Sequence, residues 1–158
     1  EDESLAAAVA LQGQLDYLHI VAGTSASLGG AVHIVPPMAI QPAYLAREAG
    51  TFKQHLGIPL FVTGRINQPQ EAELILARGQ ADVCGMTRAL ICDPQMPNKT
   101  EHGQVEDVRA CIACNQACIG HFHRGLPISC IQRPETGREL QYEQLPPTTR
   151  PKRILVAG

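Results

Sequence analysis

Three short apolar runs, separated by segments with helical spacing, constrain the fold more than any other feature of the chain. The runs are Leu15–Gly23, Leu56–Gly64 and Ala81–Met86. The expected helices are Ser4–Leu11, Tyr44–Leu56 and the segment from Pro69 to Arg78. Because strands that alternate with helices form βα units, this order predicts an α/β fold with a parallel sheet.

Glycine and arginine recur where the second and third runs end. The second run ends in Gly64-Arg65, and Thr87-Arg88 follows the third. In a TIM barrel, the loops after the last two strands commonly form a phosphate site, and backbone N–H groups and guanidinium groups suit phosphate. This matched placement favours a barrel with a phosphate site. The alternative is that each arginine pairs with acidic side chains on nearby loops.

The two ends of the chain are typical of a segment from a longer protein. The chain opens without methionine, and three strands cannot close a barrel, which takes roughly 250 residues. Near the other end, the apolar run Ile154–Ala157 precedes Gly158, as in a buried parallel strand that leads into a glycine-rich turn. A flexible polar tail is the alternative. Expressed alone, the chain is expected to aggregate or to fold with low stability.

Composition and charge exclude several classes of partner. The 158 residues are 44% hydrophobic and 18% charged, with a formal net charge of −2. This balance predicts a soluble globular protein and argues against nucleic acid or an anionic membrane as a partner. No apolar run approaches the roughly 20 residues of a spanning helix, and the N-terminus has no signal-peptide pattern. The expected location is the cytoplasm.

Four of the six cysteines form one motif with the spacing C-x2-C-x3-C-x11-C. They are Cys111, Cys114, Cys118 and Cys130. Three close thiolates and one distant thiolate are a common way to hold a cubane iron–sulfur cluster. The spacing therefore favours a 4Fe–4S cluster.

Two other uses of these thiols stay open. Zinc also takes four thiolates, or thiolates mixed with imidazoles such as those of His121 and His123, although a second C-x2-C pair is absent. Disulfides need an oxidising compartment, for which nothing in the sequence argues. Outside the motif, Cys84 is expected to be a small buried residue in the third strand, and Cys92 has no assignment.

Two long stretches closely resemble the 2,4-dienoyl-CoA reductase and trimethylamine dehydrogenase family. These stretches are GRINQPQEAELILARGQADVCGMTRALICDP and CIACNQACIGHFHRGLPISCIQRPETGRE. The family comprises the multidomain members of the Old Yellow Enzyme group, and the resemblance covers Leu15–Gly158. Its most specific part is the cysteine motif at its distance from the Gly85-Met86-Thr87-Arg88 strand end.

The resemblance implies a division of the chain into four parts. They are the last three strand–helix units of an FMN-binding TIM barrel (residues 1–108), a 4Fe–4S cluster segment (109–143), a linker (144–151) and the truncated first strand of a nucleotide-binding, Rossmann-like domain (152–158). It also implies FMN and a 4Fe–4S cluster as cofactors of this region. FAD and NAD(P)H are expected in a further C-terminal part.

The same resemblance assigns roles to single residues. Cys111, Cys114, Cys118 and Cys130 match the cluster ligands of the family. Arg65 matches an arginine that contacts FMN, Thr87 and Arg88 match the pair that holds the FMN phosphate, and Gly64 lets the backbone approach it. The apolar residues expected to shield the cluster from solvent are Ile112, Ile119 and Ile128.

One stretch departs from part of the family. Dienoyl-CoA reductases carry a histidine just after the first of these strands, where this chain reads AGTSASLGG, and no histidine occurs there before His33. The loop Thr24–Pro37 is small and flexible in composition and is expected to shape a substrate pocket or to serve as a long connection. His19, inside the first run, is expected to be a core residue.

Two functional hypotheses follow. In the first, the chain is part of an NADH:flavin oxidoreductase that passes electrons between a nicotinamide or flavin nucleotide and a small organic substrate. That substrate is an enoyl or dienoyl thioester or an N-methylated amine, and the full-length enzyme is a possible homo-oligomer. Its catalytic acid or base is expected in the N-terminal half of the barrel. In the second hypothesis, the chain is a non-catalytic binding module stabilised by zinc.

Overall fold

The computed structural model describes residues 2–142 and 146–157 and is built around a three-stranded parallel sheet. Its strands, β1 (Leu18–Ile20), β2 (Leu60–Val62) and β3 (Val83–Cys84), lie side by side in that order. The predicted α/β fold with a parallel sheet is confirmed, and each strand lies within a predicted apolar run. Closure of such a sheet into a barrel stays a prediction.

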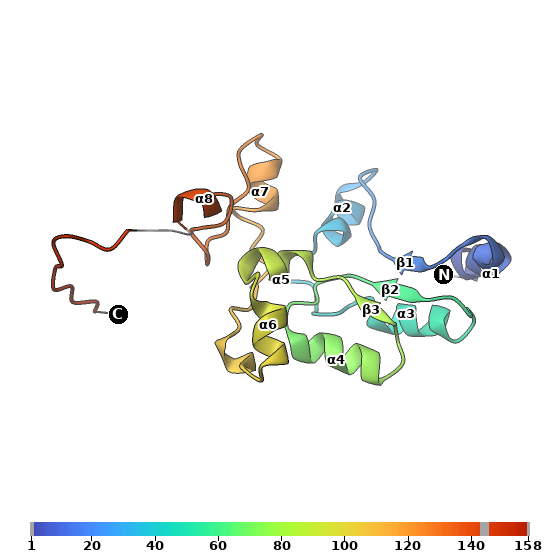
Figure 1. The fold of residues 1–158 in the computed structure, drawn as a ribbon. Coiled ribbons are helices and arrows are strands. Elements are labelled where there is room, and N and C mark those ends of the chain that lie inside the picture. Colours follow the sequence, from blue (N-terminus) through green and yellow to red (C-terminus); the bar gives the residue numbers. More distant parts are fainter. Residues whose placement is uncertain (1, 143–145, 158) are drawn as a thin grey trace.

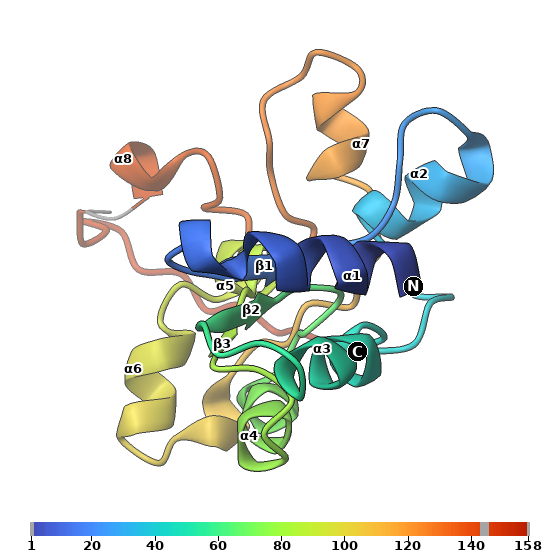
Figure 2. The ribbon, with the colours of Figure 1, turned by 90° about the vertical axis from the view of Figure 1, so that its right-hand side faces the viewer.

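Helices lie both below and above the strands in the two views (Figures 1 and 2). They are α1 (Asp2–Leu11), η1 (Gln12–Gln14), α2 (Leu28–Ile34), α3 (Ala46–Lys53), α4 (Pro69–Ala77), α5 (Thr87–Cys92), α6 (Met96–Glu101), η2 (Val105–Asp107), α7 (Ile119–Phe122) and α8 (Glu139–Tyr142). In both views α3 and α4 lie below the strands, whereas α2 and α7 stand above them. The expected helices before β1, before β2 and before β3 are therefore all present.

The core lies between the sheet and helices α3 and α4. Side chains alternate across a strand, so Leu60 and Val62 share one face, and both are fully buried against α3 and its neighbours. His19, Phe61 and Val83 are in register on the opposite face, where His19 and Val83 are exposed. The prediction that His19 is a core residue is wrong for this structure, because its side chain points away from the helix-covered face.

The stretch Thr24–Pro37, predicted as a loop, contains a two-turn helix. Helix α2 begins after Ser27, whose hydroxyl oxygen accepts a hydrogen bond from the backbone N–H of Gly30 at 3.1 Å. This N-cap serine is the feature of the sequence that indicates the start of the helix. The two glycines at the start of the helix, Gly29 and Gly30, obscured it because glycine disfavours helix.

Residues 146–157 form no regular secondary structure and are exposed. The predicted strand at 152–158 and the division of the chain into four parts stay predictions. The predicted boundary at 143/144 and the glycine at position 158 lie outside the described residues. None of the helices in the described ranges is long and apolar enough to cross a membrane.

Candidate functional site

A cavity of about 700 Å³ opens at the carboxyl ends of the three strands. The four residues predicted to bind a phosphate-bearing cofactor, Gly64, Arg65, Thr87 and Arg88, all line it. Parallel strands bring their carboxyl ends to one edge, so Arg65 and Arg88, which are 23 positions apart in the sequence, both reach it. A volume of several hundred Å³ is typical of sites for small molecules and cofactors.

The turn after β2 brings the backbone close to the cavity wall. Gly64 has φ +120°, and a Cβ atom there would lie 2.9 Å from Tyr44 Cε1 and 3.2 Å from Leu45 Cδ1. The next residue, Arg65, has φ 53°, which is uncommon for a residue other than glycine. Strained backbone of this kind concentrates at functional sites because surrounding contacts must hold it in place.

The guanidinium group of Arg65 is held by backbone carbonyls. Its Nη1 atom donates hydrogen bonds to the carbonyl oxygens of Met38 and Ile40. Its Nε atom is buried and has no hydrogen-bond partner within the described part of the chain. Burying a polar donor without a partner is costly. The Nε atom of Arg65 therefore marks a place where a ligand acceptor would be stabilised.

Arg88 also lines the cavity and bonds to neutral oxygens. Its Nη1 atom donates to the carbonyl oxygen of Pro36 at 2.8 Å and to Asn115 Oδ1 at 2.7 Å. Neither Arg65 nor Arg88 forms an ion pair with a carboxylate among residues 2–142 and 146–157. The alternative that each arginine pairs with an acidic side chain on a nearby loop is thus not what this structure shows. Two positive charges without an ionic partner among the described residues border the cavity.

Two further residues reach the cavity that the sequence analysis did not single out. His33 from α2 and Tyr44 pack with ring centroids 5.5 Å apart, and the Tyr44 hydroxyl donates to the His33 carbonyl oxygen at 2.8 Å. Burial raises the pKa of Tyr44, although the charge of Arg88 opposes this shift. His33 Nδ1 is buried and lacks a partner among the described residues. His33 was missed because its helix was predicted as a loop.

A second, smaller cavity lies beside the first and is lined by the four motif cysteines, Cys111, Cys114, Cys118 and Cys130. The structure therefore brings together thiols that are up to 19 positions apart in the sequence. Arg88 lines both cavities, and Asn115 lines the cysteine cavity. The two predicted sites are thus neighbours that share one side chain.

The cysteines surround a space rather than a single point. No group of three or more His, Cys, Asp or Glu side chains in the described ranges is arranged to hold one metal ion. Around one zinc ion, Zn–S bonds of about 2.3 Å would place the sulfur atoms only about 3.8 Å apart. Ligands of a cluster are more widely spaced, because several metal and sulfide atoms lie between them. The four motif thiols therefore line one cavity without forming a one-ion site among the described residues.

The cysteine cavity has apolar and polar walls. Of the three isoleucines predicted to shield it, Ile112 lines the cavity, whereas Ile119 and Ile128 do not, and Ile91 and Ile131 take their place. The backbone N–H of Ala113 donates to the Cys111 sulfur at 3.4 Å. Burial raises the pKa of the Cys111 thiol, and both this hydrogen bond and the charge of Arg88 oppose the shift.

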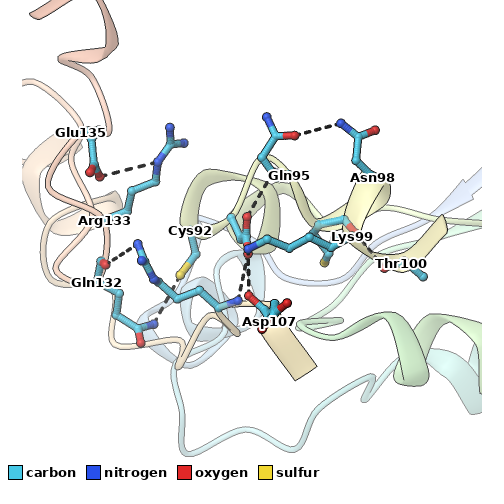
Figure 3. Close-up of polar contacts among 12 residues, drawn as sticks. Cys92, Gln95, Asn98, Lys99, Thr100, Asp107, Gln132, Arg133 and Glu135 are labelled. Atoms are coloured by element: carbon cyan, nitrogen blue, oxygen red, sulfur yellow. Dashed lines mark hydrogen bonds and ion pairs between the residues drawn. The ribbon is translucent and has the colours of Figure 1, made fainter. Parts of the chain in front are cut away.

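Cys92, which had no assignment, packs against the motif from the end of α5. It is 1% exposed, and its sulfur accepts a hydrogen bond from Gln132 Nε2 at 3.4 Å (Figure 3). Gln132 Nε2 also donates to the carbonyl oxygen of Ala110 at 2.9 Å. Burial, followed by the nearby thiols of Cys130 and Cys111, raises the pKa of Cys92 to about 12. Cys92 is therefore a buried packing residue beside the motif.

The two motif histidines and the remaining cysteine have local roles. His121 Nδ1 lies 2.9 Å from the Pro127 carbonyl oxygen, and His123 is exposed. Cys84 is half-buried in β3, close to its predicted setting, and burial raises the pKa of its thiol. All six cysteines are free thiols in this structure, so the disulfide alternative has no support from it.

The cysteine segment is fastened to the α/β part by hydrogen bonds at both of its ends. Asp93, directly after α5, accepts from the backbone N–H of Arg109 at 2.9 Å. Arg109 Nη1 donates to the Gln132 carbonyl oxygen at 2.9 Å, and the Thr136 hydroxyl donates to the Ile91 carbonyl oxygen at 3.1 Å. The motif is thus held against helix α5, which follows the strand that leads into Arg88.

Comparison with solved structures finds proteins of similar fold. A complex of 2-naphthoyl-CoA reductase with 2-naphthoyl-CoA matches with a TM-score of 0.79 and 28% identity, over 89% of this chain and 21% of that chain. Among curated proteins, a metal reductase of Desulforamulus reducens is 45% identical over 121 residues, which are 77% of this chain and 18% of that protein. An N,N-dimethylglycine/sarcosine dehydrogenase of Chromohalobacter salexigens is 30% identical over 92% of this chain and 21% of that protein.

The chain spans about a fifth of the length of the relatives it matches. The sequence profile of one family, described as NADH:flavin oxidoreductase / NADH oxidase, matches residues 26–107, more than half of the chain. That range includes the Gly64-Arg65 and Thr87-Arg88 pairs that line the larger cavity. The chain therefore belongs to the NADH:flavin oxidoreductase / NADH oxidase family.

Proposed function

We propose that this chain contributes part of the FMN site and the 4Fe–4S site of an oxidoreductase. Residues 1–108 would be the last three units of a TIM barrel, and residues 109–143 the segment that binds the cluster. The observation that carries the proposal is the position of Arg88, which lines both the strand-end cavity and the cysteine cavity. Two redox groups in these cavities would be neighbours, which is what electron transfer between them requires.

The residues around the larger cavity suit FMN. Arg65 and Arg88 have no carboxylate partner among the described residues. The buried Nε atom of Arg65 is a donor without a hydrogen-bond acceptor among the same residues. The phosphate dianion would gain charge-assisted hydrogen bonds from the two arginines. Thr87 and Arg88 would hold this phosphate, and Gly64 would let the backbone approach it. Bound flavin supplies hydride and single-electron chemistry.

The residues around the smaller cavity suit an iron–sulfur cluster. Four thiols share the cavity without the close spacing of a one-ion site, and the Ala113 N–H already donates to one sulfur. Hydrogen bonds to ligand sulfurs are among the features that set the potential of a cluster. Membership of an oxidoreductase family further favours this assignment over a zinc-stabilised binding module.

The similar proteins indicate a class of substrate. The similar proteins include a reductase crystallised with a naphthoyl thioester and a dehydrogenase named for N-methylated amino acids. We propose that the substrate of this protein is likewise a small organic molecule, either an unsaturated thioester or an N-methylated amine. The run at 152–157 would then begin a nucleotide-binding domain that uses FAD and NAD(P)H.

The test is to identify the cofactors of the full-length protein after anaerobic purification. We expect a brown protein whose broad visible absorption is bleached by dithionite, with equal amounts of iron and acid-labile sulfide. Flavin released by acid should have the mass of FMN. A colourless protein that contains stoichiometric zinc and no flavin would show the proposal to be wrong. Assays with both substrate classes would then decide between reduction and demethylation.

A further inference from the structure

We propose that Asn115 couples the two cavities, so that a metal cluster held by the cysteine motif strengthens FMN binding through Arg88. The inference rests on the proposed function, because it takes FMN and the cluster as the two ligands. Asn115 is a positioning residue in this scheme: it acts through Arg88 and is not itself a ligand of either group.

The position of Asn115 in the motif ties its side chain to the cysteines. It lies between Cys114 and Cys118, two residues that the proposed cluster would fix. Its backbone has φ 58°, a left-handed conformation that asparagine tolerates better than most residues. The backbone carbonyl oxygen of Asn115 accepts a hydrogen bond from the backbone N–H of Gly120 at 2.9 Å. A Cβ atom on Gly120 would lie 2.8 Å from the same oxygen. The turn around Asn115 is therefore tight.

The carboxamide of Asn115 uses both of its ends on the wall of the FMN cavity. Its Oδ1 atom accepts a hydrogen bond from Arg88 Nη1 at 2.7 Å, and its Nδ2 atom donates to the Val35 carbonyl oxygen at 2.8 Å. Arg88 Nη1 also donates to the Pro36 carbonyl oxygen at 2.8 Å. Val35, Pro36 and Arg88 all line the larger cavity. One side chain from the cysteine motif thus contacts two residues of the neighbouring site, Arg88 and Val35.

Through these contacts, a ligand in one cavity changes the affinity of the other cavity for its own ligand. Without the cluster, the turn that carries Asn115 has fewer restraints, and Arg88 and residues 35–36 lose a fixed anchor. FMN would then have to order Arg88 as it binds, which weakens its affinity. With the cluster in place, Arg88 is already oriented. Such coupling is reciprocal, so bound FMN should also favour retention of the cluster.

The chemistry of the contact explains why asparagine is suited to this position. The side chain must present one acceptor to Arg88 and one donor to the Val35 carbonyl oxygen, and a carboxamide does both. Aspartate would keep the acceptor, lose the donor and neutralise the charge of Arg88. Glycine would tolerate the left-handed backbone and remove both contacts. The glycine substitution therefore tests the coupling without imposing a backbone clash.

The experiment measures FMN affinity in the full-length protein with and without its metal. The FMN-free protein is prepared with the cluster reconstituted or removed, and the dissociation constant is measured by quenching of flavin fluorescence. In the wild type we expect FMN to bind about tenfold more tightly to the metal-loaded form, a coupling of ordinary size. In Asn115→Gly the ratio of the two dissociation constants should fall to about one. Gln116→Ala, at the exposed next position, should keep the wild-type ratio.

Each other outcome has one meaning. A wild-type ratio near one, with both cofactors bound, would overturn the coupling and leave the proposed function intact. A wild-type ratio that Asn115→Gly leaves unchanged would exclude Asn115 as the link. Failure of the wild type to bind FMN or iron would overturn the proposed function as well. If Asn115→Gly does not fold, Asn115→Ala, which also removes both contacts, serves instead, and its ratio must also fall toward one for the inference to stand.

Discussion

The ammonium group of Lys99 lies 2.6 Å from Asp93 Oδ2, and the same oxygen accepts a hydrogen bond from the backbone N–H of Arg109. Asp93 is 5% exposed and directly follows Cys92 at the end of α5. Lys99 Nζ also donates to the Asp107 carbonyl oxygen at 2.8 Å (Figure 3). One buried carboxylate therefore joins helices α5 and α6 to the backbone that enters the cysteine motif.

Replacing Asp93 should loosen this junction. Asp93→Asn removes the charge and leaves the partly buried Lys99 without its ionic partner, and hydrogen bonds to charged groups contribute about 1.5–3 kcal/mol each. We expect the free energy of unfolding to fall by about 2–3 kcal/mol, measured by urea denaturation of the full-length protein. Glu106→Gln, at an exposed position of η2, is the control and should change stability by less than about 0.5 kcal/mol.

The stabilising effect of Asp93 should depend on pH. Burial raises the pKa of this carboxyl group, but the Lys99 ammonium and the Arg109 and Gln95 N–H groups outweigh burial, so its pKa lies below the usual value. A carboxyl whose folded pKa is lowered stabilises the protein above its unfolded pKa, which is about 3.9. The stability difference between wild type and Asp93→Asn should therefore be constant from neutral pH down to about pH 5 and then shrink. A difference that grows on acidification would contradict this assignment.

The four-cysteine motif makes a direct prediction about metal content. Cys118→Ser should lose iron and visible absorption, because a serine oxygen replaces a thiolate poorly on iron. Cys84→Ser should keep the iron, since Cys84 lies in β3 and does not line the cysteine cavity. Iron analysis of both anaerobically purified variants tests this. Full iron content in Cys118→Ser would mean that the ligand set is wrong.

Both the charge and the planar shape of the Arg88 guanidinium group should contribute to FMN affinity. Arg88→Ala removes a hydrogen bond to a charged group, worth about 1.5–3 kcal/mol, so FMN affinity should fall roughly tenfold or more. Arg88→Lys should recover only part of the affinity, because lysine keeps the charge without the planar fork. Arg78→Ala removes an exposed arginine at the end of α4 and should leave the FMN dissociation constant unchanged. Equal affinities in Arg88→Ala and wild type would assign Arg88 a purely internal role.

The sequence predicts the sheet well because its strands are short, apolar and bounded by glycine. The order of β1, β2 and β3 and their parallel pairing follow from the alternation with helices. Gly64-Arg65 and Thr87-Arg88 could be placed at one edge for the same reason. Helix α2 could not, because its glycines have low helix propensity and its stability depends on the Ser27 cap and tertiary contacts.

Sequence patterns could not predict the contacts between segments that are distant in the sequence. The pairing of Arg88 with Asn115 joins positions 27 residues apart, and the donation from Asn115 to Val35 spans 80 residues. No local periodicity encodes such contacts. The proximity of Cys92 to the motif likewise arises from long-range contacts, such as that of Asp93 with Arg109, which hold the cysteine segment against α5. The two cavities could thus be predicted separately, whereas their shared wall appears only in the folded chain.

A substitution at Gly64 tests whether the tight turn after β2 shapes the wall of the larger cavity. Gly64→Ala meets two costs: its φ of +120° disfavours any side chain, and the new Cβ would lie 2.9 Å from Tyr44 Cε1. We expect a loss of about 2–4 kcal/mol in stability, from backbone strain plus overpacking, together with weaker FMN binding. The measurements are urea denaturation and flavin fluorescence.

Two other glycines separate these costs. Gly79 also has positive φ, at +63°, but a Cβ there meets nothing within 4 Å, so Gly79→Ala should cost only about 1 kcal/mol and spare FMN affinity. Gly29, with ordinary φ and equally open surroundings, should tolerate alanine within about 0.5 kcal/mol. If Gly64→Ala is no worse than Gly79→Ala, the close approach of Tyr44 to the Gly64 backbone does not shape the cavity. If it is worse in stability but binds FMN normally, the turn after β2 supports the fold without contacting the cofactor.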